Sequence, residues 1–330
     1  MSIAGGPEIA YDILAVSPNA AVDSYYMLSE LVIGGVNRAE KAQHTAGGKG
    51  INLARAVKAL GGKVLSLGIV GGHTGRFIIE ELRREQIPHD MAWTKNETRR
   101  SSTLILSGQM QTTVVLDSGS SVEPEAGDAL SHKIQDYAAH TRYLVLTGSL
   151  PPPLPSNYYA DIVQQAINQP QLEVCLDCSG EALRLAVEAG AHMIKVNLSE
   201  FQLSFCSGKS WDISHVAQTF SYLEKKGLKV LVITLGRDGA IIFPAGRAPF
   251  RVITRRVDHW VKTAGAGDTF MAAMLLGLNR GNSMESAMAY ASAAAAAQLQ
   301  QVVCGQLNIQ DLDFYLLETC VDDQFAFLGE

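Results

Sequence analysis

The chain has 330 residues and a formal net charge of −6; 47% of its residues are hydrophobic and 18% are charged. This composition supports a large buried core and excludes an intrinsically disordered chain. Lysine and arginine form no dense block, so we expect no nucleic-acid partner and no attraction to a membrane surface. No stretch reaches the ~18 apolar residues of a membrane span.

Five cysteines are scattered over the chain, and the N-terminus has neither the basic region nor the apolar run of a signal peptide. An odd number of dispersed cysteines is more typical of a reducing compartment than of a disulfide scaffold, so we expect a cytoplasmic protein. Cys175 and Cys178 form a C-x-x-C sequence. Because no histidine pair has the H-x₃₋₅-H spacing, a metal site is disfavoured and both are predicted to be core cysteines.

Short apolar runs recur along the chain and are typical of strands covered on both faces. They span residues 13–16, 64–70, 143–146, 172–176, 193–196, 230–233 and 240–243. Helical patterns lie between them; in residues 51–62, for example, Leu53, Val57 and Leu60 share one face and two glycines end the helix. This alternation predicts one domain over residues 1–330, a doubly wound αβα sandwich around a mostly parallel central sheet.

Two segments interrupt the alternation of strands and helices. Residues 24–45 read as extended pieces with turns, and residues 99–118 contain a hairpin with strands 103–106 and 112–116. These strands have no crossover helices. We therefore expect a small projecting β-sheet lid, which could cover a ligand or pair with another subunit through its edge.

Polar turns follow four of the predicted strands. Their sequences are TGSLPP, DCSGEAL, VNLSE and TLGRDGA. Ligands of open α/β sheets bind beyond the carboxyl ends of the strands, so four such turns at one edge predict a single long cleft.

The stretch KTAGAGDTFMAAMLLGL, residues 262–278, places Asp268 directly after glycines at the start of an apolar helix. Neither a P-loop nor a Rossmann glycine pattern is present in the chain. The bare amides of Gly265, Ala266 and Gly267 could approach an anion closely, with the helix dipole behind them. Asp268 itself could be a helix cap or a catalytic group, and the stretch alone favours the cap.

Two further motifs also have two interpretations. In AGGKGIN, residues 46–52, Lys49 and Asn52 could hold oxygen atoms of a ligand, or the stretch could be a tight turn with a solvated lysine. In VNLSE, Asn197 and Glu200 have the spacing of a capping box. Glu200 could alternatively hold a magnesium-bound water beside the phosphates of ATP.

The two motifs AGGKGINLARAVKALGG and KTAGAGDTFMAAMLLGL closely resemble the signature regions of the ribokinase-like (PfkB) carbohydrate kinases. The correspondence runs through the whole chain in order. PNAAVD, GGVNR, NETRR, TGSLPPP, DCSGEAL, KVNLSE and TLGRDGA resemble the phosphosugar branch, which includes 1-phosphofructokinase, tagatose-6-phosphate kinase and a bacterial 6-phosphofructokinase. Two positions depart from the family pattern: Val196 replaces a proline, and Pro153 replaces a glycine beside the expected sugar site.

The resemblance implies a role for each matching position. The catalytic set is the general base Asp268 with an anion hole of Gly265, Ala266 and Gly267. The sugar phosphate would be bound by Asp23, Arg38, Gly48, Lys49, Asn52, Arg99 and Ser149, with the two arginines at its phosphate. ATP and Mg²⁺ would be bound by Lys195, Asn197, Glu200, Thr234, Gly236 and Gly239, with Glu200 reaching the metal through water.

The implied reaction is ATP-dependent phosphorylation of a hexose phosphate hydroxyl, with fructose 1-phosphate as the first candidate acceptor. Asp268 would take the proton, and the helix dipole would keep it ionised at neutral pH. Tagatose 6-phosphate, fructose 6-phosphate, or an unphosphorylated sugar or nucleoside are the alternative acceptors. A sugar-phosphate-binding regulator without catalysis is disfavoured because Asp268, Gly265 and Gly267 are all present. Apolar faces on the lid strands predict a homodimer formed through the lids.

Overall fold

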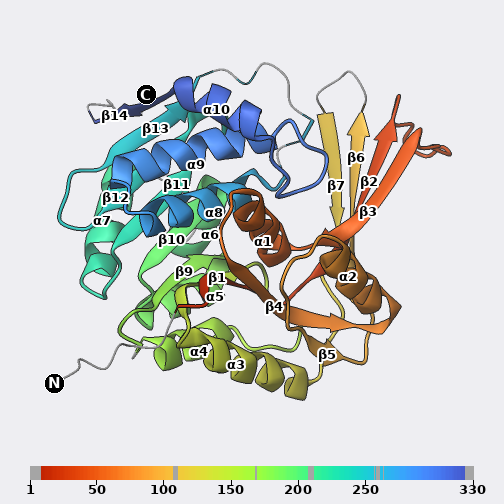
Figure 1. The fold of residues 1–330 in the computed structure, drawn as a ribbon, viewed down its shortest axis with the longest axis horizontal. Helices are drawn as coiled ribbons and strands as arrows, with labels where there is room; N and C mark the ends of the chain where they lie inside the picture. Colours follow the sequence, from red (N-terminus) through yellow and green to blue (C-terminus); the bar gives the residue numbers. More distant parts are fainter. Residues whose placement is uncertain are drawn as a thin grey trace.

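The computed structural model describes residues 9–106, 111–167, 169–206, 212–255, 257, 261–262 and 264–323, which form two sheets surrounded by helices (Figure 1). The larger sheet has ten strands in the order β14-β13-β12-β11-β10-β9-β8-β1-β4-β5. All neighbours from β11 to β5 are parallel, whereas β12, β13 and β14 are added in antiparallel fashion. The predicted α/β class with a mostly parallel sheet is confirmed.

Seven of the ten described strands of the large sheet coincide with the predicted apolar runs; β5, β13 and β14 were not among them. In chain order, the described strands are β1 (Tyr11–Ser17), β4 (Val64–Gly71), β5 (Ala92–Thr94), β8 (Thr141–Thr147), β9 (Glu173–Asp177), β10 (Met193–Asn197), β11 (Val230–Thr234), β12 (Ala240–Pro244), β13 (Phe250–Thr254) and β14 (Thr319–Asp322). Successive side chains of β1 enter opposite cores: Ile13 and Ala15 pack on one face, Leu14 and Val16 on the other. Burial on both faces explains why these strands read as continuous apolar runs.

Helices cover the two faces of the sheet separately. One core contains residues of α1 (Lys49–Ala59), α2 (Gly72–Arg84), α8 (Ala266–Asn279), α9 (Met284–Gln298) and α10 (Ile309–Leu317). The other contains residues of α3 (Pro124–Ala138), α4 (Tyr158–Ala166), α5 (Gly180–Glu188), α6 (Leu198–Phe205) and α7 (Ile213–Glu224). A short 3₁₀ turn, η1 (Gly236–Asp238), follows β11. The sandwich has three layers, as the alternation of strands and helices predicts.

A second sheet projects from the large one and forms the expected lid (Figure 1). Its strands are β2 (Ala21–Leu28), β3 (Lys41–Gly47), β6 (Arg100–Leu106) and β7 (Gln111–Leu116), in the order β3-β2-β6-β7. The strands begin nearer the large sheet than the sequence indicates, because Ala21 pairs with Gly47 and β3 runs directly into the start of α1. The base of the lid is therefore continuous with the AGGKG motif.

The two cysteines of the C-x-x-C are buried, and all five cysteines are free thiols. Among the described residues, no cluster of three or more His, Cys, Asp or Glu side chains could hold a metal ion. In the same part of the chain, no helix is long and apolar enough to cross a membrane.

Candidate active site

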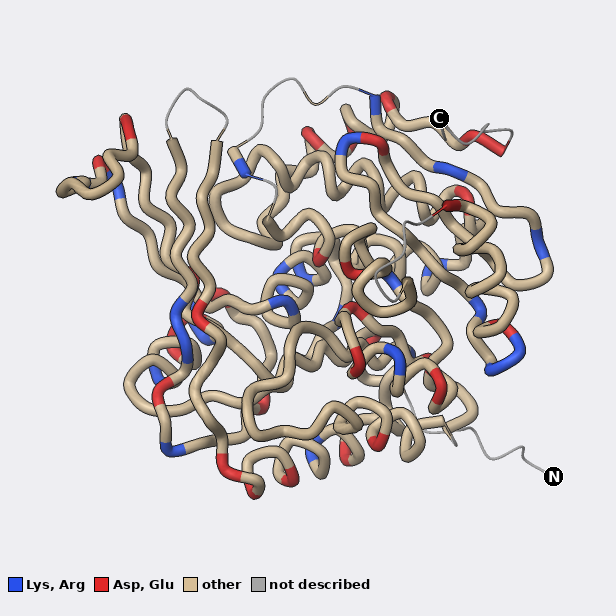
Figure 2. The backbone as a smooth tube through the Cα atoms, turned by 180° about the vertical axis from the view of Figure 1, so that it is seen from behind, with Lys and Arg blue, Asp and Glu red and all other residues tan. Residues whose placement is uncertain are grey.

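Most of the predicted site residues come from the base of the lid, the start of α1, the start of α8 and the carboxyl ends of β8, β10 and β11. Backbone positions of basic and acidic residues lie near one another in the middle of the molecule, below the lid (Figure 2). Because the carboxyl ends of parallel strands lie at one edge of a sheet, segments far apart in sequence converge there.

Lys49 and Lys195 are held by a shared carboxylate. The Lys49 Nζ lies 2.9 Å from Asp177 Oδ1 and 2.9 Å from Glu200 Oε1, while the Lys195 Nζ lies 2.8 Å from Asp177 Oδ2. Asp177 is completely buried at the end of β9. Burial raises its pKa, but the two ammonium groups outweigh burial and hold the pKa below its usual value. Conversely, Asp177 and Glu200 raise the pKa of Lys49 against the effect of burial, so Lys49 is a charged group and not a solvated turn residue.

Asp268 lies in the first turn of α8, but it is not the helix cap. Gly265 occupies the N-cap position with a φ of 88°, and no side chain caps the helix. The Asp268 carboxylate accepts a 3.0 Å hydrogen bond from Asn52 Nδ2. Burial and the nearby charge of Asp177 raise the pKa of Asp268 to about 6, with Lys49 and Lys195 acting in the opposite direction. Burial is the largest influence on this pKa, and a carboxyl with a pKa of about 6 is mostly ionised at neutral pH, which is the state expected from the sequence.

The turn of Gly265, Ala266 and Gly267 presents bare backbone beside a cation. A Cβ atom on Gly267 would lie 2.8 Å from Lys195 Nζ, so this ammonium lies directly against the turn. The positive φ of Gly265 favours glycine, and a Cβ there would also lie 2.7 Å from Cys304 Cβ. Backbone amides at a helix start with an ammonium alongside can bind a phosphoryl group.

On the lid side, Asp23 and Arg99 face the start of α1. A Cβ on Gly47 would lie 2.2 Å from the Asp23 carboxylate, and the Gly48 amide donates a hydrogen bond to it. Burial raises the pKa of Asp23, and nearby cations, including Arg55 and Arg99, oppose that rise. Asp23 therefore depends on surrounding positive charge to remain ionised.

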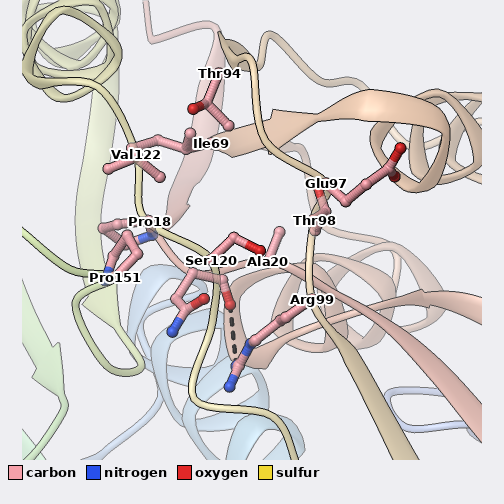
Figure 3. A pocket seen from close by; sticks show the side chains of 11 residues that line it. Pro18, Ala20, Ile69, Thr94, Glu97, Thr98, Arg99, Ser120, Val122 and Pro151 are labelled. Atoms are coloured by element: carbon pink, nitrogen blue, oxygen red, sulfur yellow. Dashed lines mark hydrogen bonds between the residues drawn. The ribbon is translucent and has the colours of Figure 1, made fainter.

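Arg99 lines a small pocket with Thr98, Ser120 and Pro151, and its side chain reaches toward the loop of residues 18–20 (Figure 3). Its guanidinium donates to the backbone carbonyls of Asp117 at 2.9 Å and Asn19 at 3.0 Å. The side chain of Asn19 donates in turn to Ser149 Oγ at 3.0 Å, which places Ser149 in the same group of residues. Burial lowers the pKa of Arg99.

The predicted nucleotide residues lie on adjacent strand ends. Asn197 pairs in register with Thr234 at the ends of β10 and β11, and Gly236 and Gly239 take positive φ values around η1. The capping-box interpretation of the VNLSE motif is confirmed, and the magnesium role of Glu200 stays a prediction. Asn197 and Glu200 form a capping box with two 2.9 Å hydrogen bonds, while the other carboxylate oxygen of Glu200 contacts Lys49.

Arg38 is the predicted site residue that the structure does not bring to the others. It is exposed in the connection between β2 and β3, at the end of the lid away from Asp23. Met27 pairs with Lys41 at that end, whereas Asp23 pairs with Thr45 near the base.

Asp177 is the central residue that the sequence analysis did not assign. The turn containing it, DCSGEAL, was recognised as a polar turn after a strand, but the carboxylate itself was not singled out. Its available signal was an acidic residue at the carboxyl end of the strand EVCLD, directly before the polar turn.

Comparison with known proteins agrees with this geometry. A model described as pfkB family carbohydrate kinase matches residues 16–310. Phosphofructokinase-2 from Escherichia coli, in complex with potassium, has a TM-score of 0.85 and 24% identity, covering 93% of this chain and 98% of that one. A Thermotoga maritima protein titled "possible 1-phosphofructokinase" has a TM-score of 0.83 and 20% identity, covering 94% and 98%.

A more distant structure has the same fold: ribokinase from Arabidopsis thaliana, complexed with ribose and ATP, has a TM-score of 0.71 and 19% identity and covers 96% of this chain. These likenesses show the fold, and the family match shows the class of reaction. The chain belongs to the pfkB family of carbohydrate kinases and is an ATP-dependent sugar kinase.

Proposed function

We propose that this kinase phosphorylates a hydroxyl group of a hexose phosphate, with fructose 1-phosphate as the acceptor and fructose 1,6-bisphosphate as the product. The observation that carries the phosphosugar assignment is Arg99. Its guanidinium is partly buried beside Asp23 and Ser149, it donates only to backbone carbonyls, and among the described residues it makes no ion pair within 4 Å. Asp23 and Asp117 influence this guanidinium electrostatically but form no ion pair with it. A guanidinium without a direct carboxylate partner suits the phosphate of an acceptor, which it can bind through two parallel hydrogen bonds.

The proposed chemistry assigns a separate task to each half of the GAGD motif. Asp268 accepts the proton of the attacking hydroxyl, while Asn52 holds the carboxylate in place. The Gly265–Gly267 amides and Lys195 stabilise the charge of the phosphoryl group during transfer. Lys49 is fixed by Asp177 and Glu200, so it is oriented before any ligand binds.

Magnesium fits the same group of residues. Asp177 and Glu200 place carboxylate oxygens around a cation, Lys49, and hard oxygen ligands are those that Mg²⁺ prefers. When bound with ATP, Mg²⁺ would neutralise charge on the nucleotide phosphates, with Glu200 reaching it through water. Thr234, Gly236 and Gly239 would border the nucleotide.

A second candidate acceptor is fructose 6-phosphate. It is favoured by one observation, the solved complex of E. coli phosphofructokinase-2 with that sugar phosphate, at 24% identity to this chain. At this identity the acceptor of the relative does not determine the acceptor of this chain. Ser149 and Pro153 lie on the turn that follows β8, and we expect residues of this turn to influence which sugar phosphate is accepted.

The test measures ADP release from Mg-ATP with fructose 1-phosphate, tagatose 6-phosphate, fructose 6-phosphate, fructose and ribose. Turnover with fructose 1-phosphate, lost in Asp268→Asn and kept in the exposed control Asp136→Asn, would support the proposal. Turnover with a different phosphosugar would keep the reaction and change the acceptor. Preference for an unphosphorylated sugar would contradict the role of Arg99, and no turnover with any acceptor would contradict the kinase proposal as a whole.

A homodimer through the lids is part of the proposal. Val114, Val115 and Leu116 on β7 are exposed, and β7 is an edge strand of the lid. The proposed phosphate contact of Arg38 requires this second copy, because Arg38 is distant from Asp23 within one chain. If sedimentation shows a monomer at micromolar concentration, both the lid-mediated homodimer and the phosphate contact of Arg38 are contradicted. The free cysteines support a cytoplasmic location.

A further inference from the structure

Lys262 is a fully buried lysine that the proposed chemistry does not use. Its ammonium donates to Ala264 O at 3.0 Å and to Cys304 Sγ at 2.8 Å, and it lies 5.1 Å from the centre of the Tyr25 ring. Within the described part of the chain no carboxylate lies within 4 Å of it. Asp23 interacts with it electrostatically but forms no ion pair with it. Because burying a charge without an ion pair is costly, the position of this lysine calls for a physical reason.

One side of this ammonium contacts the anion-hole turn. Its hydrogen bond to Ala264 O fixes the residue immediately before Gly265. Cys304, its second partner, packs so closely on Gly265 that a Cβ there would lie 2.9 Å from the thiol sulfur. Burial raises the pKa of Cys304, so the thiol accepts the ammonium hydrogen bond as a neutral group. Lys262, Cys304 and the turn therefore form one packed unit.

The other side of the ammonium contacts the lid. Tyr25 lies on β2, two residues beyond Asp23, and its hydroxyl donates to Cys304 Sγ at 3.4 Å while the Cys304 amide donates to the same hydroxyl. The ammonium over the Tyr25 ring adds a cation–π contact. Its charge also lowers the pKa of Asp23 against the effect of burial. A single cation thus contacts the lid strand of the sugar site and the turn before the general base.

The partner segment is itself held rigidly. Arg55 donates to Cys304 O at 2.6 Å. The buried side chain of Gln298 accepts from the Gly305 amide at 2.6 Å and donates to Val303 O at 3.3 Å. Removing the ammonium would therefore leave Cys304 in place. It would free the carbonyl of Ala264, the residue directly before the Gly265–Gly267 turn.

We propose that Lys262 is a positioning residue: a built-in cation that fixes the Gly265–Gly267 turn against the base of the lid, so that the phosphoryl-binding amides and Asp23 keep one geometry. Its effect on catalysis rests on the proposed function, whereas its effect on the order of the turn does not. A misplacement of about 1 Å can cost about 10²-fold in rate. We therefore expect loss of the ammonium to lower kcat about 10- to 100-fold and to change the KM for ATP by less than about threefold.

The experiment compares wild type, Lys262→Met, Lys262→Ala and the exposed control Lys225→Met. Hydrogen exchange of the peptide covering residues 264–272 is measured in the ligand-free protein, together with kcat, both KM values and the unfolding midpoint. In Lys262→Met we expect faster exchange confined to this peptide and to β2, with the unfolding midpoint kept or raised, because methionine fills the same volume without a buried charge. Ammonium or methylammonium should restore part of the kcat of Lys262→Ala, whereas tetramethylammonium should not, and none of these ions should stimulate the wild type.

Unchanged exchange of the 264–272 peptide in Lys262→Met would overturn the proposal whatever the activity. Faster exchange throughout the chain, with a lowered unfolding midpoint and no rescue by ammonium, would also overturn it, since that pattern marks a general stability role. If the local exchange changes as expected but wild type transfers no phosphoryl group to any acceptor, the proposed function fails and the positioning role of Lys262 stands.

Discussion

Replacing Asp268 by asparagine tests the assignment of the general base, because the change is almost isosteric. Gly265 is the N-cap of α8, so the substitution removes no cap and should leave the helix start intact. An amide oxygen can still accept the hydrogen bond from Asn52. What the variant loses is the ability to take a proton from the acceptor hydroxyl.

Two magnitudes follow from the structure. Loss of a positioned general base should lower kcat about 10²- to 10⁴-fold, which is about 2.7–5.5 kcal/mol of transition-state stabilisation. Stability should change in the opposite direction. The pKa of Asp268 is raised from 3.8 to about 6 by burial and by Asp177, so ionising it above pH 6 costs the folded state about 3 kcal/mol relative to the unfolded chain. Asparagine carries no such cost.

The assay combines steady-state kinetics with denaturant unfolding at pH 8 and pH 4. At pH 8 Asp268→Asn should be nearly inactive yet more stable than wild type by up to about 3 kcal/mol. Most of the gain should disappear as the pH falls from 6 to 4, because Asp268 becomes protonated in the folded state, and the remainder should disappear below the unfolded pKa of 3.8. Near-wild-type kcat would refute the base assignment. A variant that is inactive and less stable at pH 8 would refute the electrostatic reasoning, since the loss of activity would then follow from damage to the fold.

Three further outcomes are expected. In wild type, kcat/KM should fall about tenfold per pH unit below about pH 6, as the carboxylate of Asp268 becomes protonated; a profile flat to pH 5 would contradict this. Asp177→Asn should destabilise the fold by about 3 kcal/mol, because Lys195 loses its counter-ion. The same substitution should move the acidic limb of the kcat/KM profile to lower pH, because Asp177 raises the pKa of Asp268. Denaturant unfolding checks the loss of stability, and a pH–rate profile checks the shift of the limb. Arg99→Ala should raise the KM for the sugar phosphate at least about tenfold while the KM for ATP changes little, and equal changes would count against the phosphosugar site.

Seven strands of the large sheet could be predicted because burial on both faces imposes an uninterrupted apolar run; β5, β13 and β14 were not predicted. Residues 319–322, TCVD, have no such run, and they form β14 only by pairing in antiparallel register with β13. The sequence contains no local signal for that pairing. The lid was predicted from alternation and turns, but the extension of β3 to Gly47 depends on pairing with Ala21, a contact between distant residues.

Site residues in glycine-rich motifs were found because bare backbone at a helix start has a distinctive sequence. Asp177 was missed because its importance depends on its two partners: Lys49 lies 128 residues away in the chain, and Lys195 lies on the next strand of the sheet. A carboxylate after a strand is common, and only the fold shows that it holds two cations. Lys262 illustrates the same limit, since in sequence it is a lysine of an otherwise ordinary loop, and Cys304 and Tyr25 approach it only in the folded protein.

The balance of charge indicates what a divalent cation would add to the lysines in the proposed reaction. Without ligands, two ammonium groups lie among three carboxylates, those of Asp177, Glu200 and Asp268. The ion pairs hold the lysines in position, and they leave too little positive charge for Lys195 alone to balance the phosphates of a nucleotide. Negative phosphates entering this group would raise the pKa of Asp268 further and protonate the base. Magnesium arriving with ATP would supply the missing positive charge, so the same ion that screens the phosphates would also keep Asp268 able to accept a proton.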